Sequence, residues 1–477
     1  MTMKRFIGVT GLVLCLATTG AMAQLPEDAL RFATPGFGVG ARALGMGNAY
    51  TGVASDFSAI YWNPAGLAQL VHGEFSLGLN YNDHQDNSTF FGNQESYSTN
   101  ATNLNTFGVV YPLPVQRGNA TLAFGFTRQN SFLTGMSFKG FNPNSTIAQW
   151  YAPDGWYDPN DPSYNLAYML YLADTNATGQ YVSPIKNRLT QLGTVIEGGG
   201  LNNWSAAGGF DLSKNFSVGV TLTYLSGSYR YDRSYREEDS QHLYSNLPLA
   251  NYKSFQALAI DDYIDDDVSG WNAMLGLMYR VPDKFRFGMT IKTPTALTIH
   301  EKYGTTGHSY FNDGPVTEFT SDARNDYDIT TPWVFGAGMS VILRDLILSA
   351  DIDYTDWTTL EFTNASADLI AENKDIKTLF HGTANLRGGA EYELTSIGLR
   401  LRGGFFYNPS PFRGDPGNFA QKVVTGGLGI LLGESTMIDL AYARGWRDTF
   451  IYNYDATSRV DEKIATNTVL LTLTHRF

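Results

Sequence analysis

Four basic side chains lie in stretches where apolar and polar residues alternate. Arg286, Lys292, Arg387 and Arg402 all fall on the polar side of this alternation. A cation held on the polar face of a strand could bind the carboxylate of an acidic ligand. It could instead pair with a neighbouring acid in a partly dry interior, and the acids available for such pairing are Asp351, Asp353, Glu391 and Asp439. Both roles stay open at this stage.

Other groups that could carry chemistry show no catalytic or metal-binding pattern. The seven histidines lack metal-ligand spacing, there is no G-x-S-x-G motif, and the single cysteine is Cys15. We therefore expect no enzyme activity, no metal and no cofactor. The acidic residues 261–262 and 265–267 could bind calcium only if their oxygens converge. A solvated rim, bridged to lipopolysaccharide by divalent ions, accounts for them better.

One long polar stretch contains two apolar segments. The first consists of Tyr168, Met169, Tyr171 and Leu172. The second follows Ser183-Pro184, which suits the start of a helix, and its stripe of Ile185, Leu189, Leu192 and Ile196 has helical spacing. The two segments either pack on each other or form a groove that collects an apolar ligand.

The composition points to an exported membrane or periplasmic protein. Residues 1–23 have a basic start, an apolar core and an Ala-x-Ala end at Ala21–Ala23, which predicts a signal peptide cleaved after Ala23. The chain is 17% charged, with 28 Tyr, 29 Phe and 49 Gly, a charged fraction below the usual value of about 25%. Its net charge of −13 argues against nucleic acid as a partner. A soluble periplasmic β-protein and an outer-membrane barrel are the two remaining classes.

Alternation with a period of two decides between these classes. It predicts about fourteen strands, each with an apolar face and a face of small or polar residues, as in a transmembrane antiparallel β-barrel. The predicted strands cover 74–82, 104–112, 119–128, 202–212, 216–230, 266–280, 285–302, 328–343, 346–362, 379–394, 397–408, 420–433, 436–450 and 462–477.

The connections support a barrel. Short links alternate with long ones, and the long ones include loops 129–201, 231–265 and 303–327. Short turns at one rim and long loops at the other are typical of outer-membrane barrels. The chain also ends in an alternating strand that closes on Phe477, similar to the terminal signal of such barrels.

Residues 37–70 follow neither period and are rich in Gly and Ala. Their small residues allow close backbone approach, and Asn63-Pro64-Ala65-Gly66 has turn chemistry. A barrel of about fourteen strands leaves an open channel unless something fills it. We therefore predict that residues 24–73 form a hatch inside the lumen of a barrel spanning 74–477. The expected hatch residues are Gly45, Gly47, Asn63, Pro64, Ala65 and Gly66.

Two regions carry a family resemblance. The first includes Gly45-Met46-Gly47 and Tyr61-Trp62-Asn63-Pro64-Ala65-Gly66; the second includes Thr331-Pro332 and the stretches 348–357, 386–392 and 401–411. Together they resemble the FadL/TodX family of outer-membrane transporters for hydrophobic compounds. The resemblance implies a fourteen-stranded barrel with a hatch. It also implies ligands such as long-chain fatty acids or aromatic hydrocarbons, which bind in a loop groove and then a pocket and leave through a gap in the wall.

The predicted function is passive uptake of hydrophobic compounds across the outer membrane by a monomer that contacts outer-membrane lipids and lipopolysaccharide. The alternative is a protein like PorV, which has a similar glycine-rich, Asn-Pro-Ala beginning and binds secreted partners in a secretion pathway. A barrel lipase would need a nucleophile and base that the sequence does not display. The predicted ligand-binding residues are Tyr168, Met169, Tyr171, Leu172, Leu189, Leu192, Arg286, Lys292, Arg387 and Arg402.

Overall fold

The computed structural model describes residues 26–154 and 165–477. The predicted signal peptide and its cleavage site lie outside the described residues. Within these residues, no helix is long and apolar enough to cross a membrane.

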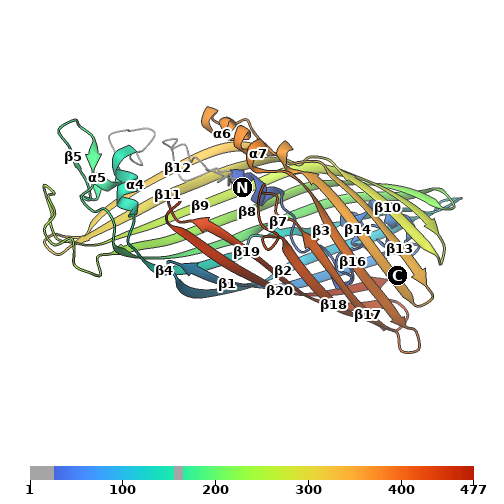
Figure 1. The fold of residues 1–477 in the computed structure, drawn as a ribbon. Helices are drawn as coiled ribbons and strands as arrows, with labels where there is room; N and C mark the ends of the chain where they lie inside the picture. The colour runs from blue at the N-terminus through green and yellow to red at the C-terminus, as the bar shows by residue number, and fades with distance from the viewer. Residues whose placement is uncertain (1–25, 155–164) are drawn as a thin grey trace, which may run out of the picture.

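The wall is a closed antiparallel barrel of fourteen strands (Figure 1), which confirms the predicted fold class. Closure comes from β1, which pairs with β2 on one side and with the last strand, β20, on the other. Four of the wall strands are interrupted, so 18 segments make up the sheet. The uninterrupted strands are β1 (Glu74–Phe90), β2 (Asn93–Leu113), β7 (Leu189–Ser213), β8 (Phe216–Glu238), β9 (Phe255–Val281), β16 (Gly382–Leu394), β17 (Leu399–Asn408), β18 (Gln421–Leu432), β19 (Thr436–Tyr452) and β20 (Arg459–Arg476).

Side-chain alternation explains why these segments form a membrane wall. On β1, Leu77, Leu79 and Tyr81 are exposed on the outer face, whereas Ser76 and Asn80 are buried inside. The same pattern recurs on the other strands and gives the barrel an apolar belt. An apolar exterior with a polar interior is the arrangement that a bilayer requires of a β-barrel.

Prolines interrupt two strands that we predicted as continuous. Thr293-Pro294-Thr295 divides the predicted strand 285–302 into β10 (Phe285–Lys292) and β11 (Ala296–Phe311). Thr331-Pro332 divides the other into β12 (Thr317–Thr330) and β13 (Val334–Leu343). Proline has no N–H to give to the sheet ladder. The other interrupted strands are β3 (Ala120–Ser131) with β4 (Thr134–Asn142), and β14 (Leu346–Asp356) with β15 (Glu361–Thr363).

The three predicted long loops are partly strand. β7 begins at Leu189, β8 continues to Glu238, β9 begins at Phe255, β11 continues to Phe311 and β12 begins at Thr317. Figure 1 shows these strands as the long wall of the barrel. Their outer residues above the apolar belt are mostly polar, for example Arg230, Asp261 and Asp322. These upper parts therefore lack the apolar face by which we recognised the other strands.

The helix predicted after Ser183-Pro184 is wrong, because residues 189–213 form β7. Leu189 is buried on the inner side, Leu192 is half-buried and Ile196 is exposed on the opposite face. These residues are spaced as on one face of a helix, but in the strand they lie on both the inner and the outer face. Backbone pairing with β4 and β8 stabilises the strand instead.

The N-terminal segment fills the lumen. It forms α1 (Pro26–Ala33), α2 (Ala41–Gly45), α3 (Ala59–Trp62) and the 3-10 helix η1 (Pro64–Gln69), and the wall begins at Glu74. Its apolar residues are almost completely buried, including Leu44, Met46 and Tyr50. This segment is the predicted hatch, and it lies inside the barrel as expected.

The expected hatch residues contact the wall very closely. The Asn63 side chain accepts a hydrogen bond from the Ala65 amide at 3.1 Å, and it donates to the carbonyls of Thr51 and, on β9, Leu277. Gly47 has a φ of 61°. It lies against Gly404 of β17 so closely that a Cβ added to Gly404 would come within 2.3 Å of the Gly47 nitrogen. Small residues on both sides therefore let the hatch seat against the wall.

An insertion lies at the opposite end of the barrel. It contains α4 (Ile147–Asp154), α5 (Leu166–Met169) and the small strands β5 (Asp174–Thr175) and β6 (Tyr181–Val182). Figure 1 shows α4 and α5 at the end opposite the C-terminus. The buried Glu237 carboxylate accepts hydrogen bonds from Thr146, Ile147, Gln191 and Tyr235. Burial still raises the pKa of Glu237 above its ordinary value.

A smaller cover flanks the barrel near its middle. It consists of η2 (Trp357–Thr359), α6 (Ala367–Ala371) and α7 (Asn373–Leu379), which lie along one side of the wall (Figure 1). Apolar residues of this cover, including Leu360, Leu369 and Ile376, share a core with Phe32 of α1. The cover and α1 therefore enclose the lumen above the hatch.

Candidate functional site

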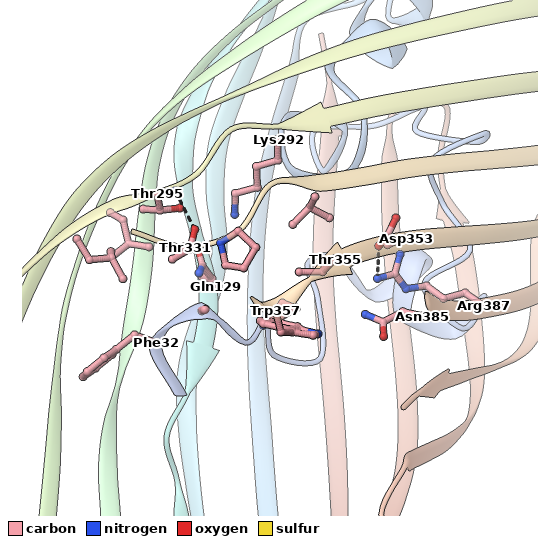
Figure 2. Close-up of a pocket in the computed structure, with 16 residues that line it drawn as sticks. Phe32, Gln129, Lys292, Thr295, Thr331, Asp353, Thr355, Trp357, Asn385 and Arg387 are labelled. Atoms are coloured by element: carbon pink, nitrogen blue, oxygen red, sulfur yellow. Dashed lines mark hydrogen bonds and ion pairs between the residues drawn. The ribbon is translucent and has the colours of Figure 1, made fainter. Parts of the chain in front are cut away.

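A pocket lies inside the barrel where the wall strands are interrupted (Figure 2). Both proline breaks contribute to it, through Thr295 on one side and through Thr331 and Pro332 on the other. The two breaks are joined because the Thr295 amide donates to the Thr331 hydroxyl at 2.8 Å. The lining residues are Phe32, Ala33, Pro35, Gln129, Leu225, Lys292, Thr295, Leu297, Thr331, Pro332, Val334, Asp353, Thr355, Trp357, Asn385 and Arg387.

Lys292 is the distinctive residue of this pocket. It is the last residue of β10 and points inward, as the alternation predicts. Figure 2 shows its ammonium extending toward Thr331. In the described part of the chain, no carboxylate forms an ion pair with it and no hydrogen bond to its side chain is found. A half-buried cation without a protein partner favours binding of an anion.

Arg387 lies on the other side of the pocket and is already paired. Its guanidinium is 2.5 Å from the Asp353 carboxylate, and Figure 2 shows this pair beside Asn385. The same guanidinium lies 5.4 Å from the ring centre of Trp62 in the hatch. Arg387 therefore connects the pocket to the hatch, and its charge is largely neutralised by Asp353.

Apolar surfaces complete the pocket. Phe32 of α1 packs edge-on against Phe132 and Tyr229, with ring centres 5.7 and 6.0 Å away. Trp357 is held in place because its indole N–H donates to the Thr383 hydroxyl at 2.8 Å. Together with Leu225 and Leu297, these rings give one pocket both an apolar wall and a cation. With a cavity volume of about 60 Å³, the pocket suits the head group of an amphipathic ligand rather than its whole body.

The other two predicted cations have different surroundings. Arg402 has a completely buried side chain and forms ion pairs of 2.6 Å with both Glu391 and Asp439. Arg286 faces the hatch, where it donates to the Val53 carbonyl at 3.4 Å. Of the four cations, the structure thus brings only Lys292 and Arg387 into this pocket.

The six predicted apolar ligand residues lie elsewhere: Leu189 and Leu192 are on β7, and the other four belong to the insertion. Leu172 and Leu189 are buried in its core, whereas Tyr168 and Tyr171 are exposed, at 41% and 37%. Met169 and Leu192 are half-buried. The structure therefore divides this set among the core of the insertion, its surface and the wall strand β7.

The pocket residues Thr295, Thr331, Trp357 and Asn385 were missed by sequence reasoning. The Thr-Pro pairs at 293–294 and 331–332 were a usable signal, because proline within a strand pattern indicates an interruption. Among residues 26–154 and 165–477, no group of three or more His, Asp, Glu or Cys side chains could hold a metal ion.

The hydrogen-bonded ladder between β2 and β3 covers only part of their length. Their ladder ends at Thr106 opposite Thr127, and the next residues of β3 pair only with β7. β4 likewise pairs with β7, so residues 93–105 of β2 have a ladder partner only in β1. The barrel wall therefore lacks strand pairing at this position.

Comparison with known proteins identifies the family. The family model of the outer membrane protein transport protein (OMPP1/FadL/TodX) matches residues 194–477, more than half of the chain. The chain belongs to this family. The FadL/TodX membership confirms the resemblance seen in the sequence, although the hatch lies outside the matched residues. No curated protein sequence matches the chain.

Solved structures share the FadL/TodX fold with this chain. The P. putida toluene transporter TodX has a TM-score of 0.57 at 14% identity, covering 92% of this chain and 99% of that one. A Pseudomonas aeruginosa FadL homologue has a TM-score of 0.55 at 14% identity, covering 95% and 99%. The Ralstonia pickettii toluene transporter TbuX has a TM-score of 0.51 at 15% identity, covering 94% and 100%. The barrel is thus an outer-membrane barrel of this family.

Proposed function

We propose that this barrel takes up hydrophobic compounds across the outer membrane, and that its preferred ligand has an apolar body and an anionic head. The observation that carries this proposal is the unpaired Lys292 ammonium, which faces an interior wall formed by Phe32, Leu225 and Trp357. A long-chain fatty acid has this chemistry. A toluene-like hydrocarbon has no anionic group for Lys292 to bind.

The proposed route uses three features of the fold. Exposed Tyr168 and Tyr171, with Met169, collect the apolar ligand at the insertion. The pocket then holds the head group at Lys292. Arg387, which is paired with Asp353, helps to orient the head group. The break between β2 and β3 provides a lateral exit into the membrane. We further propose that the barrel acts as a monomer with lipopolysaccharide around its outer rim.

The Lys292→Gln variant tests the head-group assignment. Hydrogen bonds to charged groups contribute about 1.5–3 kcal/mol, so we expect the affinity for a long-chain fatty acid to fall about tenfold to hundredfold. Toluene affinity is expected to stay within about twofold, because toluene makes no ionic contact. Equilibrium binding of both labelled ligands to the purified protein measures this difference.

Lys214→Gln is the matched control, because Lys214 lies in the short turn between β7 and β8, away from the pocket. It should leave both affinities unchanged. Equal fatty-acid affinity in Lys292→Gln and Lys214→Gln would refute the assignment of the head group to Lys292.

A further inference from the structure

A second groove lies on the outside of the barrel, at the rim where the turns are short. It is lined by Lys284, Phe285, Met339, Val341, Ile342 and Leu343. Phe285 and Val341 are register partners on the paired strands β10 and β13. Phe285, Met339 and Leu343 are exposed on the membrane-facing surface, at 36%, 50% and 54%. The groove is therefore apolar and opens toward the lipid.

Charged residues stand at the end of this groove. Lys284 belongs to the turn between β9 and β10, and Arg344 belongs to the turn between β13 and β14. The Ile342 amide donates to the Lys284 carbonyl at 2.7 Å, which holds these turns side by side. Both side chains are exposed, and neither forms an ion pair within the described residues.

Each cation has an acidic neighbour in its own turn, namely Asp283 beside Lys284 and Asp345 beside Arg344. Beyond the β13–β14 turn, Arg400 of β17 pairs with Glu393 of β16 at 3.2 Å. The two turns at this end of the groove thus carry two positive and two negative residues, of which Lys284 lines the groove itself. This pattern matches a head group that carries both charges.

We infer that this groove binds one zwitterionic glycerophospholipid whose head carries a phosphate and a primary ammonium. An acyl chain lies along Phe285, Met339 and Leu343. The phosphate contacts Lys284 and Arg344, and the ammonium contacts Asp283 and Asp345. Charged hydrogen bonds to a phosphate are the strong kind. The site lies outside the lumen and does not depend on the proposed transport ligand.

Native mass spectrometry of the delipidated full-length barrel tests this inference by titration with phosphatidylethanolamine. We expect one tightly retained lipid in the wild type. Lys284→Gln removes a phosphate contact, and Met339→Trp fills the apolar groove. Each should weaken retention about tenfold or more, whereas the rim variant Lys214→Gln should retain the lipid as the wild type does.

Two further titrations fix the head-group chemistry. Phosphatidylglycerol has the phosphate but no ammonium, so it should bind more weakly than phosphatidylethanolamine. The inference is overturned if both lipids are retained equally, if lipopolysaccharide occupies the site instead, or if Lys284→Gln and Met339→Trp retain lipid as Lys214→Gln does. Heat-modified mobility on gels confirms that each variant is a folded barrel before it is titrated.

Discussion

At the scale of single residues, Arg42 ties the hatch to the barrel wall. Its guanidinium makes two hydrogen bonds to the Glu391 carboxylate, at 2.8 and 2.6 Å, and a third to the Ser55 hydroxyl at 2.9 Å. Glu391 is also paired with Arg402, which in turn contacts Asp439. Removing Arg42 therefore removes one charged contact between hatch and wall, while the wall keeps its own ion pairs.

We predict that Arg42→Met loosens the hatch without unfolding the barrel. The lost charged contacts are each worth about 1.5–3 kcal/mol, so amides of residues 41–47 should exchange with solvent about tenfold to hundredfold faster. Hydrogen exchange followed by mass spectrometry measures this. Arg459→Met breaks an exposed pair with Asp461 and serves as the control. Unchanged exchange in Arg42→Met would show that Arg42 does not hold the hatch.

The sequence could place the inward cations but not their partners. Alternation along a strand indicates which face a side chain occupies, and this sufficed to put Arg402 and Lys292 inside. The pairing of Arg402 with Glu391 depends on the register of β16 against β17, where these residues are directly opposite. The additional contact of Glu391 with Arg42 depends on the position of the hatch. A single sequence specifies neither relation.

At the scale of elements, glycines on the wall make room for the hatch. A Cβ at Gly404 on β17 would lie 2.3 Å from the backbone nitrogen of Gly47 and 2.5 Å from the carbonyl carbon of Met46. Gly403 is next to it and points outward, where a Cβ would have its nearest neighbour at 4.0 Å. These adjacent glycines differ mainly in whether the hatch lies against them.

We predict that Gly404→Ala displaces the hatch and that Gly403→Ala does not. Backbone atoms cannot move away from a Cβ at 2.3 Å without shifting the hatch. The displaced hatch should open a water path, because a barrel of this width is not closed by its wall side chains alone. Liposome swelling with a small sugar measures the leak. The explanation fails if Gly404→Ala liposomes are as tight as Gly403→Ala liposomes.

The sequence predicted strands well only where lipid contacts them. β13, β17 and β18 have apolar outer faces and agree with the predicted ranges within a few residues, apart from the break at Pro332. The upper parts of β8, β9 and β12 stand above the apolar belt and have polar outer faces, so they were taken for loops. The pocket was missed for a related reason, since it forms where Pro294 and Pro332 interrupt the wall beside α1.

At the scale of the whole molecule, two packed cores lie toward opposite ends of the lumen. The hatch core around Met46 and Tyr50 fills one end, and the insertion core around Leu166 and Leu170 fills the other. The pocket with Lys292 lies in the lumen between these two cores, beside α1. The lateral exit proposed for a ligand held there lies where the ladder between β2 and β3 ends. Fourteen strands, a hatch and an internal pocket together indicate a transporter for apolar molecules.

The most direct test is uptake by cells. We predict that a strain lacking this protein imports a labelled long-chain fatty acid more slowly than the parent, and that the wild-type gene restores the rate. The Lys292→Gln gene should restore the barrel in the outer membrane without restoring fatty-acid uptake. Import at the parental rate by the deletion strain, for both the fatty acid and toluene, would contradict the proposed function.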